Sequence, residues 1–165
     1  MQVNILKKIS IFLLVLILIL VVFTYQEKEI VPDEQQINVE ECSIMQEACV
    51  VKLGGDTNAS VRFNISPKGM PTTKPAIIDV SLNNIDANKI TVKFISLDLD
   101  YEVPMVSLNK INNNSFNGKA FLSLCTSEKT KWVSNLVIYT KNKTWNLSFP
   151  FIHSGDGYNI IKPSF

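Results

Sequence analysis

The chain has 165 residues, of which 46% are hydrophobic and 19% are charged, and its formal net charge is +1 at pH 7. This length allows one ordinary folded domain beside an apolar first segment. Its lysines are scattered singly, without a basic stripe, which excludes the electrostatic footprint of a nucleic-acid-binding protein.

The N-terminal segment predicts a membrane anchor. Lys7 and Lys8 precede an uncharged run from Ile9 to Gln26 that consists mostly of Ile, Leu, Val and Phe. At about 1.5 Å per residue, a helix over this run would cross most of a roughly 30 Å hydrocarbon layer. A cleaved signal peptide is the alternative, but it needs small residues before its cleavage point, and no Ala or Gly precedes Ala48. Residues 1–26 are therefore expected to be a cytoplasmic stub and an uncleaved, single-pass anchor in the inner membrane, with the C-terminal domain in the periplasm.

Residues 27–47 predict an acidic spacer. They hold seven acidic residues against Lys28 alone, together with Pro32 and paired glutamines. Such a composition buries too little apolar surface to order itself. The expected domain boundaries are therefore 1–26, 27–47 and 48–165.

Residues 48–165 show the pattern of an all-β domain. Every second residue is apolar in SVRFNISP, AIIDVSLNN, KITVKFIS, GKAFLSLC, WVSNLVIY and TWNLSFPF, and turn-forming runs such as SPKGMP and NNNSFNG separate these stretches. The pattern predicts an immunoglobulin-like antiparallel β-sandwich of seven or eight strands, with Trp132 and Trp145 packed in its core. The clearest hairpin joins Trp132–Thr140 to Thr144–Phe151.

The order of several motifs resembles a group of extracytoplasmic domains. CSIMQEAC is followed by VRFNISPKGMPTTKPAIIDVSL, then ITVKFISLDLDYEV, then SFNGKAFLSLCTSEKTKWVSNLVI. In this order, over nearly the whole soluble part, the chain resembles small proteins of Gram-negative bacteria with YtkA-like and FixH-like sandwich domains. The resemblance implies a role in copper handling or cytochrome oxidase assembly. It also implies a Met-rich loop after KFISLD, but residues 97–105 read LDLDYEVPM with Met105 alone, so copper binding is not carried over.

The three cysteines lie in an oxidising compartment on this topology, where thiols usually pair. On the chain-entropy model, a bond between Cys42 and Cys49 stabilises by roughly 2.5 kcal/mol, and the longer loop from Cys49 to Cys125 by roughly 4 to 5 kcal/mol. Cys42 follows a flexible spacer and reaches a neighbour easily, whereas Cys125 ends a strand on the face opposite its core-like residues. We therefore expect a Cys42–Cys49 disulfide. A pair that involves Cys125, free thiols and metal binding are the alternatives.

Few residues predict a metal site. The soft candidate ligands are Cys42, Met45, Cys49, Met70, Met105, Cys125 and His153. Two or three of the sulfurs could bind Cu(I) if the fold brought them together, but isolated methionines in a sandwich more often fill gaps in the core. His153, beside Ser154 in a turn-like stretch, is expected to be a solvated loop residue. No metal site or cofactor is therefore assigned, and copper remains an alternative.

The acidic residues Asp98, Asp100 and Glu102 alternate along LDLDYE. They could bind a hard cation such as calcium, or form a solvated edge that discourages strand addition, which is the favoured interpretation. The sequence contains no paired CxxC, HExxH, GxSxG elbow or Gly-rich phosphate loop. It therefore predicts neither an enzyme nor a small-molecule substrate.

The anchor, the sandwich pattern and the resemblance together predict a membrane-anchored periplasmic binding or assembly module. Its expected partner is another envelope protein, with a link to copper handling or cytochrome oxidase assembly. The alternative is a purely structural envelope protein whose disulfide only stabilises it and which binds no metal.

Overall fold

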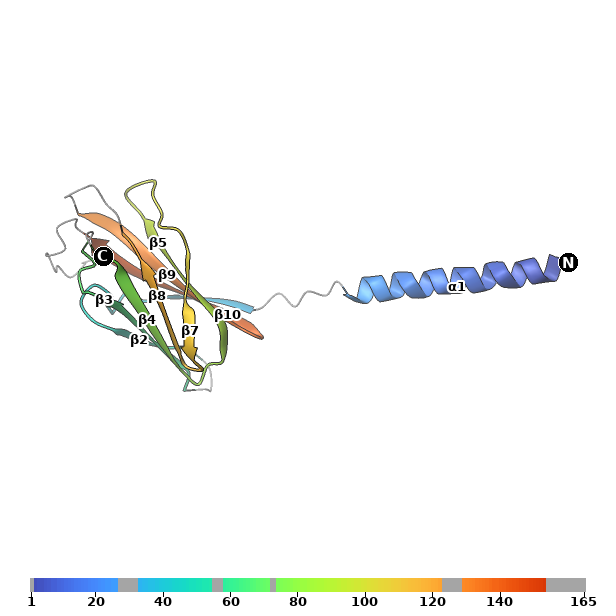
Figure 1. Ribbon diagram of the computed structural model, residues 1–165, viewed down its shortest axis with the longest axis horizontal. Helices are drawn as coiled ribbons and strands as arrows, with labels where there is room; N and C mark the ends of the chain where they lie inside the picture. The colour runs from blue at the N-terminus through green and yellow to red at the C-terminus, as the bar shows by residue number, and fades with distance from the viewer. Residues whose placement is uncertain (1, 27–32, 55–57, 72–73, 123–128, 154–165) are drawn as a thin grey trace. The chain divides into compact units, whose positions relative to one another are not determined.

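The computed structural model describes residues 2–26, 33–54, 58–71, 74–122 and 129–153 (Figure 1). The chain divides into two compact units, Met1–Val31 and Pro32–Phe165. Cys125 lies outside the described residues.

The first unit contains the helix α1 (Gln2–Gln26). A helical membrane span needs roughly 20 predominantly apolar residues. Within the part of the chain that the structure describes, no helix is both long and apolar enough to meet this need. The expected transmembrane anchor is therefore not confirmed.

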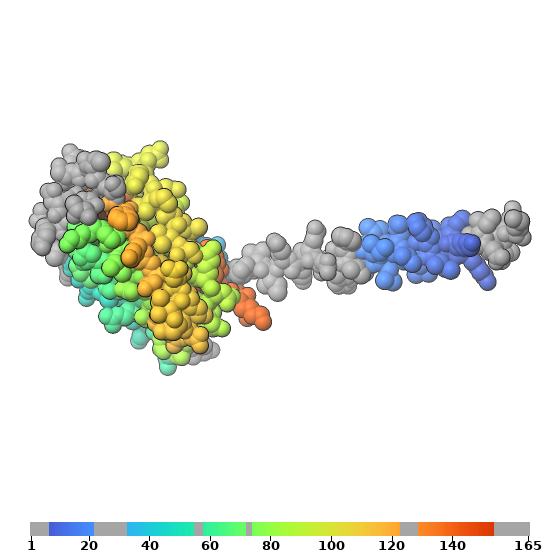
Figure 2. Space-filling model, viewed as in Figure 1, coloured from blue at the N-terminus to red at the C-terminus, as the bar shows by residue number. Residues whose placement is uncertain are grey.

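The second unit is a sandwich of two five-stranded sheets. The first sheet has the order β1 (Asp33–Asn38), β10 (Lys143–His153), β9 (Thr130–Thr140), β5 (Ala87–Ser96) and β6 (Val106–Ser107). The second has the order β2 (Cys49–Lys52), β3 (Ser60–Ser66), β4 (Ala76–Asn83), β8 (Ser115–Ala120) and β7 (Asn109–Asn112). Neighbouring strands are antiparallel except β1 and β10, which are parallel. In the space-filling view, β7 and β8 are exposed on the near face (Figure 2).

The all-β sandwich is therefore confirmed, with ten strands among the described residues instead of seven or eight. Five of the six alternating stretches coincide with β3, β4, β5, β9 and β10. The predicted hairpin is confirmed by the pairing of β9 with β10, from Tyr139 opposite Thr144 to Thr130 opposite His153. The sixth stretch, GKAFLSLC, begins inside β8, whose last residue is Ala120.

Strand β1 shows that the spacer prediction was wrong for residues 33–47. All six residues of β1 pair with β10, from Asp33 opposite Lys143 to Asn38 opposite Ser148. Its side chains are exposed apart from the half-buried Ile37, so the acidic residues do stay in water. The backbone nevertheless pairs with the sheet, and the folded unit begins near Pro32 instead of Ala48.

The core lies between the inner faces of the two sheets. Strand β4 alternates without a break, with Ala76, Ile78, Val80 and Leu82 buried and the residues between them exposed. Such alternation gives one face to the core and one to water.

Aromatic rings join the two halves of this core. The rings of Phe63 in β3 and Phe149 in β10 lie 4.9 Å apart between centroids. The Trp132 ring is fully buried and packs between Tyr101 at 6.0 Å and Phe151 at 6.4 Å. These contacts confirm the packing role expected for Trp132, and the half-buried Trp145 also packs against the core.

Candidate functional site

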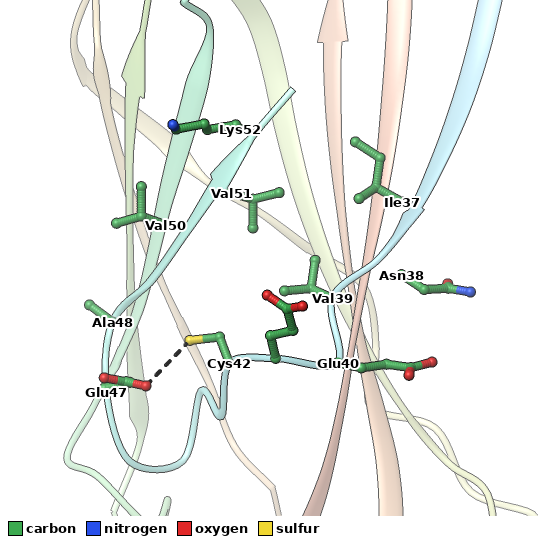
Figure 3. Close-up of a pocket in the computed structure, with 11 residues that line it drawn as sticks. Ile37, Asn38, Val39, Glu40, Cys42, Glu47, Ala48, Val50, Val51 and Lys52 are labelled. Atoms are coloured by element: carbon green, nitrogen blue, oxygen red, sulfur yellow. Dashed lines mark hydrogen bonds between the residues drawn. The ribbon is translucent and has the colours of Figure 1, made fainter. Parts of the chain in front are cut away.

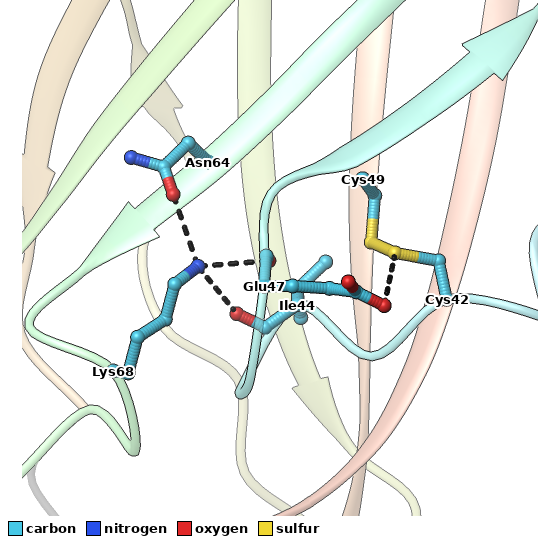
Figure 4. The surroundings of a disulfide bond; sticks show 6 residues. All are labelled: Cys42, Ile44, Glu47, Cys49, Asn64 and Lys68. Carbon is cyan, nitrogen blue, oxygen red and sulfur yellow. Dashed lines mark hydrogen bonds between the residues drawn. A yellow bond between two sulfur atoms is a disulfide. The ribbon is translucent and has the colours of Figure 1, made fainter.

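A disulfide marks the place where the chain crosses from one sheet to the other. Cys42 follows β1, and Cys49 begins β2. Their sulfur atoms are bonded and their Cα atoms lie 5.7 Å apart (Figure 4), a separation within the usual range for a disulfide. The predicted Cys42–Cys49 pair is therefore confirmed.

The loop between the two cysteines is compact. The carbonyl of Ser43 accepts hydrogen bonds from the amides of Gln46 at 3.0 Å and Glu47 at 3.1 Å. The side chain of Ile44 is only 1% exposed and belongs to the core. The loop is thus fixed by a turn, by an apolar anchor and by a covalent bond.

Lys68 holds the same loop from the turn that follows β3. Its Nζ donates to the carbonyl of Glu47 at 2.8 Å, to Oδ1 of Asn64 at 3.0 Å and, more weakly, to the carbonyl of Ile44 at 3.4 Å (Figure 4). Burial lowers the pKa of the Lys68 ammonium below its ordinary value of 10.5; the charge of Glu47 opposes this shift and that of Arg62 adds to it. An ammonium that donates to three acceptors acts as a structural tie, although the Lys68 side chain is largely exposed.

The Glu47 carboxylate lies beside the disulfide. Its Oε1 is 3.9 Å from Sγ of Cys42. Because the bonded sulfur carries no hydrogen, this approach is a contact and not a hydrogen bond. The Glu47 side chain is exposed and remains available to a partner.

A groove runs beside this loop, between the edge strands β1 and β2 (Figure 3). Its volume is about 800 Å³. Three valines, Ile37 and Ala48 supply its apolar lining, and the polar lining comes from Asn38, Cys42, three glutamates and Lys52. Val39, the residue after β1, and Val51 of β2 both line it (Figure 3). The groove is therefore the open side of the sandwich, where β1 and β2 are the last described strands of their sheets.

Strand β2 turns unpaired backbone groups toward this open side. It ends the second sheet, and β3 is its single neighbour among the described strands. Along an antiparallel pair, successive residues direct their N–H and C=O groups alternately toward and away from the neighbour. The Leu53 amide donates to the Ala59 carbonyl at 2.9 Å, so the backbone groups of Val50 and Lys52 point away from β3.

Strand β1 also ends its sheet. The Val39 amide donates to the Ser148 carbonyl at 2.9 Å, so the backbone groups of Asn38 and Gln36 point away from β10 by the same alternation. Within the described ranges, both sheets thus present free hydrogen-bonding groups beside one groove.

The groove carries charge of opposite sign at its two ends. Glu40 and Glu47 lie near Cys42, and Lys52 lies at the far end (Figure 3). Glu41 also lines the groove. Within the described ranges, the ion pairs are Lys93 with Glu102 and Lys143 with Asp33, all outside the groove, so none of the three glutamates is paired internally.

The candidate soft ligands are spread across the domain. The two cysteines are joined to each other, Met70 is buried, Met105 is 59% exposed in the loop after β5, and Met45 is partly buried. The described residues contain no group of three or more His, Cys, Asp or Glu side chains that could hold a metal ion.

His153 contradicts the expectation of a solvated loop residue. It is the last residue of β10 and is fully buried. Its Nε2 lies 2.7 Å from the carbonyl of Met70, and Nδ1 has no hydrogen-bond partner among the described residues. The strand extends two residues past the predicted end at Phe151 and carries the imidazole into the interior.

The acidic loop after β5 is split between separate contacts. Oδ2 of Asp98 accepts a hydrogen bond from the Lys131 amide at 2.6 Å, and Glu102 forms an ion pair with Lys93 at 2.6 Å. Both acidic side chains are exposed, as the edge interpretation expects.

Sequence reasoning missed the groove because its walls are backbone edges. The side chains of β1 are nearly all polar and exposed, so they show no alternation. Strand β2 has only four residues, too few for a periodic signal. The one usable signal was the pair of consecutive valines at positions 50 and 51, since a strand that turns Val51 inward must turn Val50 outward; the structure exposes 62% of Val50.

The chain was compared with family models, curated proteins and solved structures. No family model matches the chain, and no curated protein matches it. Among solved structures, a DUF4785 family protein from Legionella pneumophila matches at 14% identity with a TM-score of 0.44, over 58% of this chain and 28% of that one. This likeness is too distant to carry function, and the resemblance to YtkA-like and FixH-like domains gains no support from these comparisons.

Proposed function

We propose that the β-sandwich is an extracytoplasmic binding or assembly module, of immunoglobulin-like type, that docks another envelope protein at the groove between β1 and β2. The observation that carries the proposal is the coincidence of two free sheet edges with an unpaired acidic rim in one groove of about 800 Å³. Exposed edges are normally protected in soluble domains. An edge left open beside an apolar groove is a means of recognition, and the proposal assigns no catalysis to it.

The compartment rests on the cysteines and the N-terminal sequence. The Cys42–Cys49 bond is of the kind that persists in oxidising environments. The uncharged run from Ile9 to Gln26 behind Lys7 and Lys8 supports attachment at the inner membrane with the domain in the periplasm.

Fractionation tests this placement. The proposal expects the full-length chain in the membrane fraction, with Cys42 and Cys49 blocked to alkylation until a reductant is added. Recovery in the cytosol with both thiols alkylated directly would contradict it.

Site-specific photo-crosslinking in the native host tests the docking surface. A photoreactive amino acid in place of Val50 is expected to give one defined envelope-protein adduct, identified by mass spectrometry. The matched control replaces Ile77 of β4, which is also exposed but lies two strands away in the same sheet. Equal adducts from both positions, or none from position 50, would refute the groove as the docking surface.

A structural envelope protein without a partner is the second candidate. The observation that favours it is the set of ties on residues 42–49, since the disulfide, Lys68 and Ile44 all fix one short loop. Loss of stability without loss of any adduct, on removal of these ties, would support this candidate.

A copper role depends on the redox state of the pair. In the disulfide both sulfurs are bonded, whereas reduction would offer two thiolates, which are good Cu(I) ligands. Isothermal titration of the full-length protein with Cu(I), before and after reduction, tests this link to copper handling. Absence of micromolar binding by the reduced protein would remove it.

A further inference from the structure

We propose that the partner docks by adding an extended, basic-ended segment as a strand against the free edge of β2. This inference rests on the proposed function and specifies the chemistry of the partner. Three observations carry it: the direction of the β2 backbone groups, the charge polarity of the groove, and the exposed valine on that edge.

The backbone of β2 is prepared for a further strand. Val50 and Lys52 direct their N–H and C=O groups away from β3, and these groups have no partner among the described residues. A strand added to a sheet edge gains affinity from such main-chain hydrogen bonds and specificity from alternate side chains. Four residues of β2 match a segment of four to six residues, roughly 14 to 20 Å long.

The edge of β2 is less protected than that of β1. Sheet edges are usually guarded by charged side chains or proline. Strand β1 begins with Asp33 and Glu34, whereas β2 exposes 62% of Val50 at its middle and has a charge only at Lys52. Strand β2 is therefore the edge that accepts an added strand.

The side chains define what that strand carries. Residues of the segment opposite Val51 would face inward, toward the lining formed by Val39 and Val51, and so are apolar. Its end beside the disulfide loop meets Glu40, Glu41 and Glu47, and so is basic. The opposite end of the segment meets Lys52, and Arg62 lies beside Val50 on the outer face. This end of the segment therefore carries no positive charge.

Peptide binding to the full-length protein in mild detergent tests the proposal. The probes are two capped peptides, VTVTVKK and KKVTVTV, which present the basic end to the disulfide loop in antiparallel and parallel orientation. One of them is expected to bind with micromolar affinity. Its glutamate analogue should bind about tenfold more weakly at low salt, and an analogue N-methylated at alternate residues should also lose about tenfold.

Protein variants separate strand addition from general attraction. Val50→Pro removes the amide that points away from β3 and leaves the β2–β3 hydrogen bonds in place, as edge positions tolerate; it should weaken binding about tenfold. Val50→Thr retains the amide and should stay within about threefold. Glu41→Gln should weaken binding about two- to fivefold, while Asp100→Asn, an exposed acid in the loop after β5, should have no effect.

Amide hydrogen exchange gives a readout that charge attraction alone does not move. In the wild type, bound peptide should slow exchange at the amides of Val50 and Lys52, which have no partner among the described residues. In the Val50→Thr variant, it should slow exchange at the amide of Lys52. Equal binding by the N-methylated peptide, or unchanged exchange at both amides, would overturn strand addition. If crosslinking at position 50 still yields a partner, only this inference fails; if that adduct is also absent, the proposed function fails with it.

Discussion

Opening the Cys42–Cys49 bond is the perturbation whose cost follows most directly from the structure. The suitable variant is Cys42→Ala, compared with the oxidised parent in a Cys125→Ala background that excludes new pairings. Cys42 is half-buried, whereas Cys49 is fully buried. Removing Cys42 therefore leaves the packing of Cys49 in place, since a free thiol behaves as a small apolar group.

The expected cost is a property of the unfolded chain. The bond joins residues seven apart in sequence, for which the chain-entropy model gives about 2.5 kcal/mol. The native loop should survive without the bond because Ile44 stays in the core and Lys68 still bonds to the Glu47 carbonyl. Nearly the whole 2.5 kcal/mol should then appear as lost stability.

Urea unfolding of both proteins, followed by tryptophan fluorescence, measures this cost. With a slope of about 2 kcal/mol per molar urea, typical for this size, the midpoint should fall by about 1.2 M. Native circular dichroism should be unchanged. A loss below about 1 kcal/mol, or a native spectrum that changes on substitution, would refute the reasoning, because it would mean that the bond does not act by restricting the unfolded chain.

Further outcomes are expected in the same assay. Lys68→Met should cost about 1 to 2 kcal/mol through its lost hydrogen bonds. Burial lowers the Lys68 pKa below 10.5 in the folded chain, so the unfolded chain binds more protons in the pH window just below 10.5. The difference in unfolding free energy between the parent and Lys68→Met should therefore grow as the pH rises through this window. A difference that stays constant with pH would contradict this. Thr130→Val leaves the Trp132 Nε1 donor unpaired in the core and should cost about 1 to 3 kcal/mol, whereas no loss would show that water replaces the hydroxyl. Gly118→Ala would place a Cβ 2.5 Å from Leu108 Cδ2 and should destabilise, while Gly54→Ala, with open space around it, should be neutral; equal effects would contradict the packing at Gly118.

The strands that the sequence predicted are those that pack one face of side chains against the core. Strands β4, β9 and β10 alternate apolar and polar residues because one face packs against the core, and this alternation is visible in the letters. Strand β1 is placed mainly by backbone pairing to β10, and Ile37 is its one side chain that packs against the core. Its acidic side chains look the same whether the backbone pairs or not, so composition could not reveal it.

Of the candidate site, the disulfide could be predicted from the sequence, whereas the groove and the position of His153 could not. The Cys42–Cys49 bond could be predicted because Cys42 was expected to reach a neighbour easily, whereas Cys125 ends a strand on the face opposite its core-like residues. The groove could not, because it depends on which strands end their sheets. His153 was misjudged because the turn-forming residues after it suggested a loop, whereas the alternation that buries Phe149 and Phe151 continues to position 153.

The position of the disulfide also sets a mechanical limit. A pull on the chain before Asp33 would load β1 first and peel it from β10. Residues 33–41, once released, would span at most roughly 30 Å. The covalent bond at Cys42 would then pass the load directly to Cys49 and β2, so the loop 43–48 with its buried Ile44 would be bypassed and could not be drawn out.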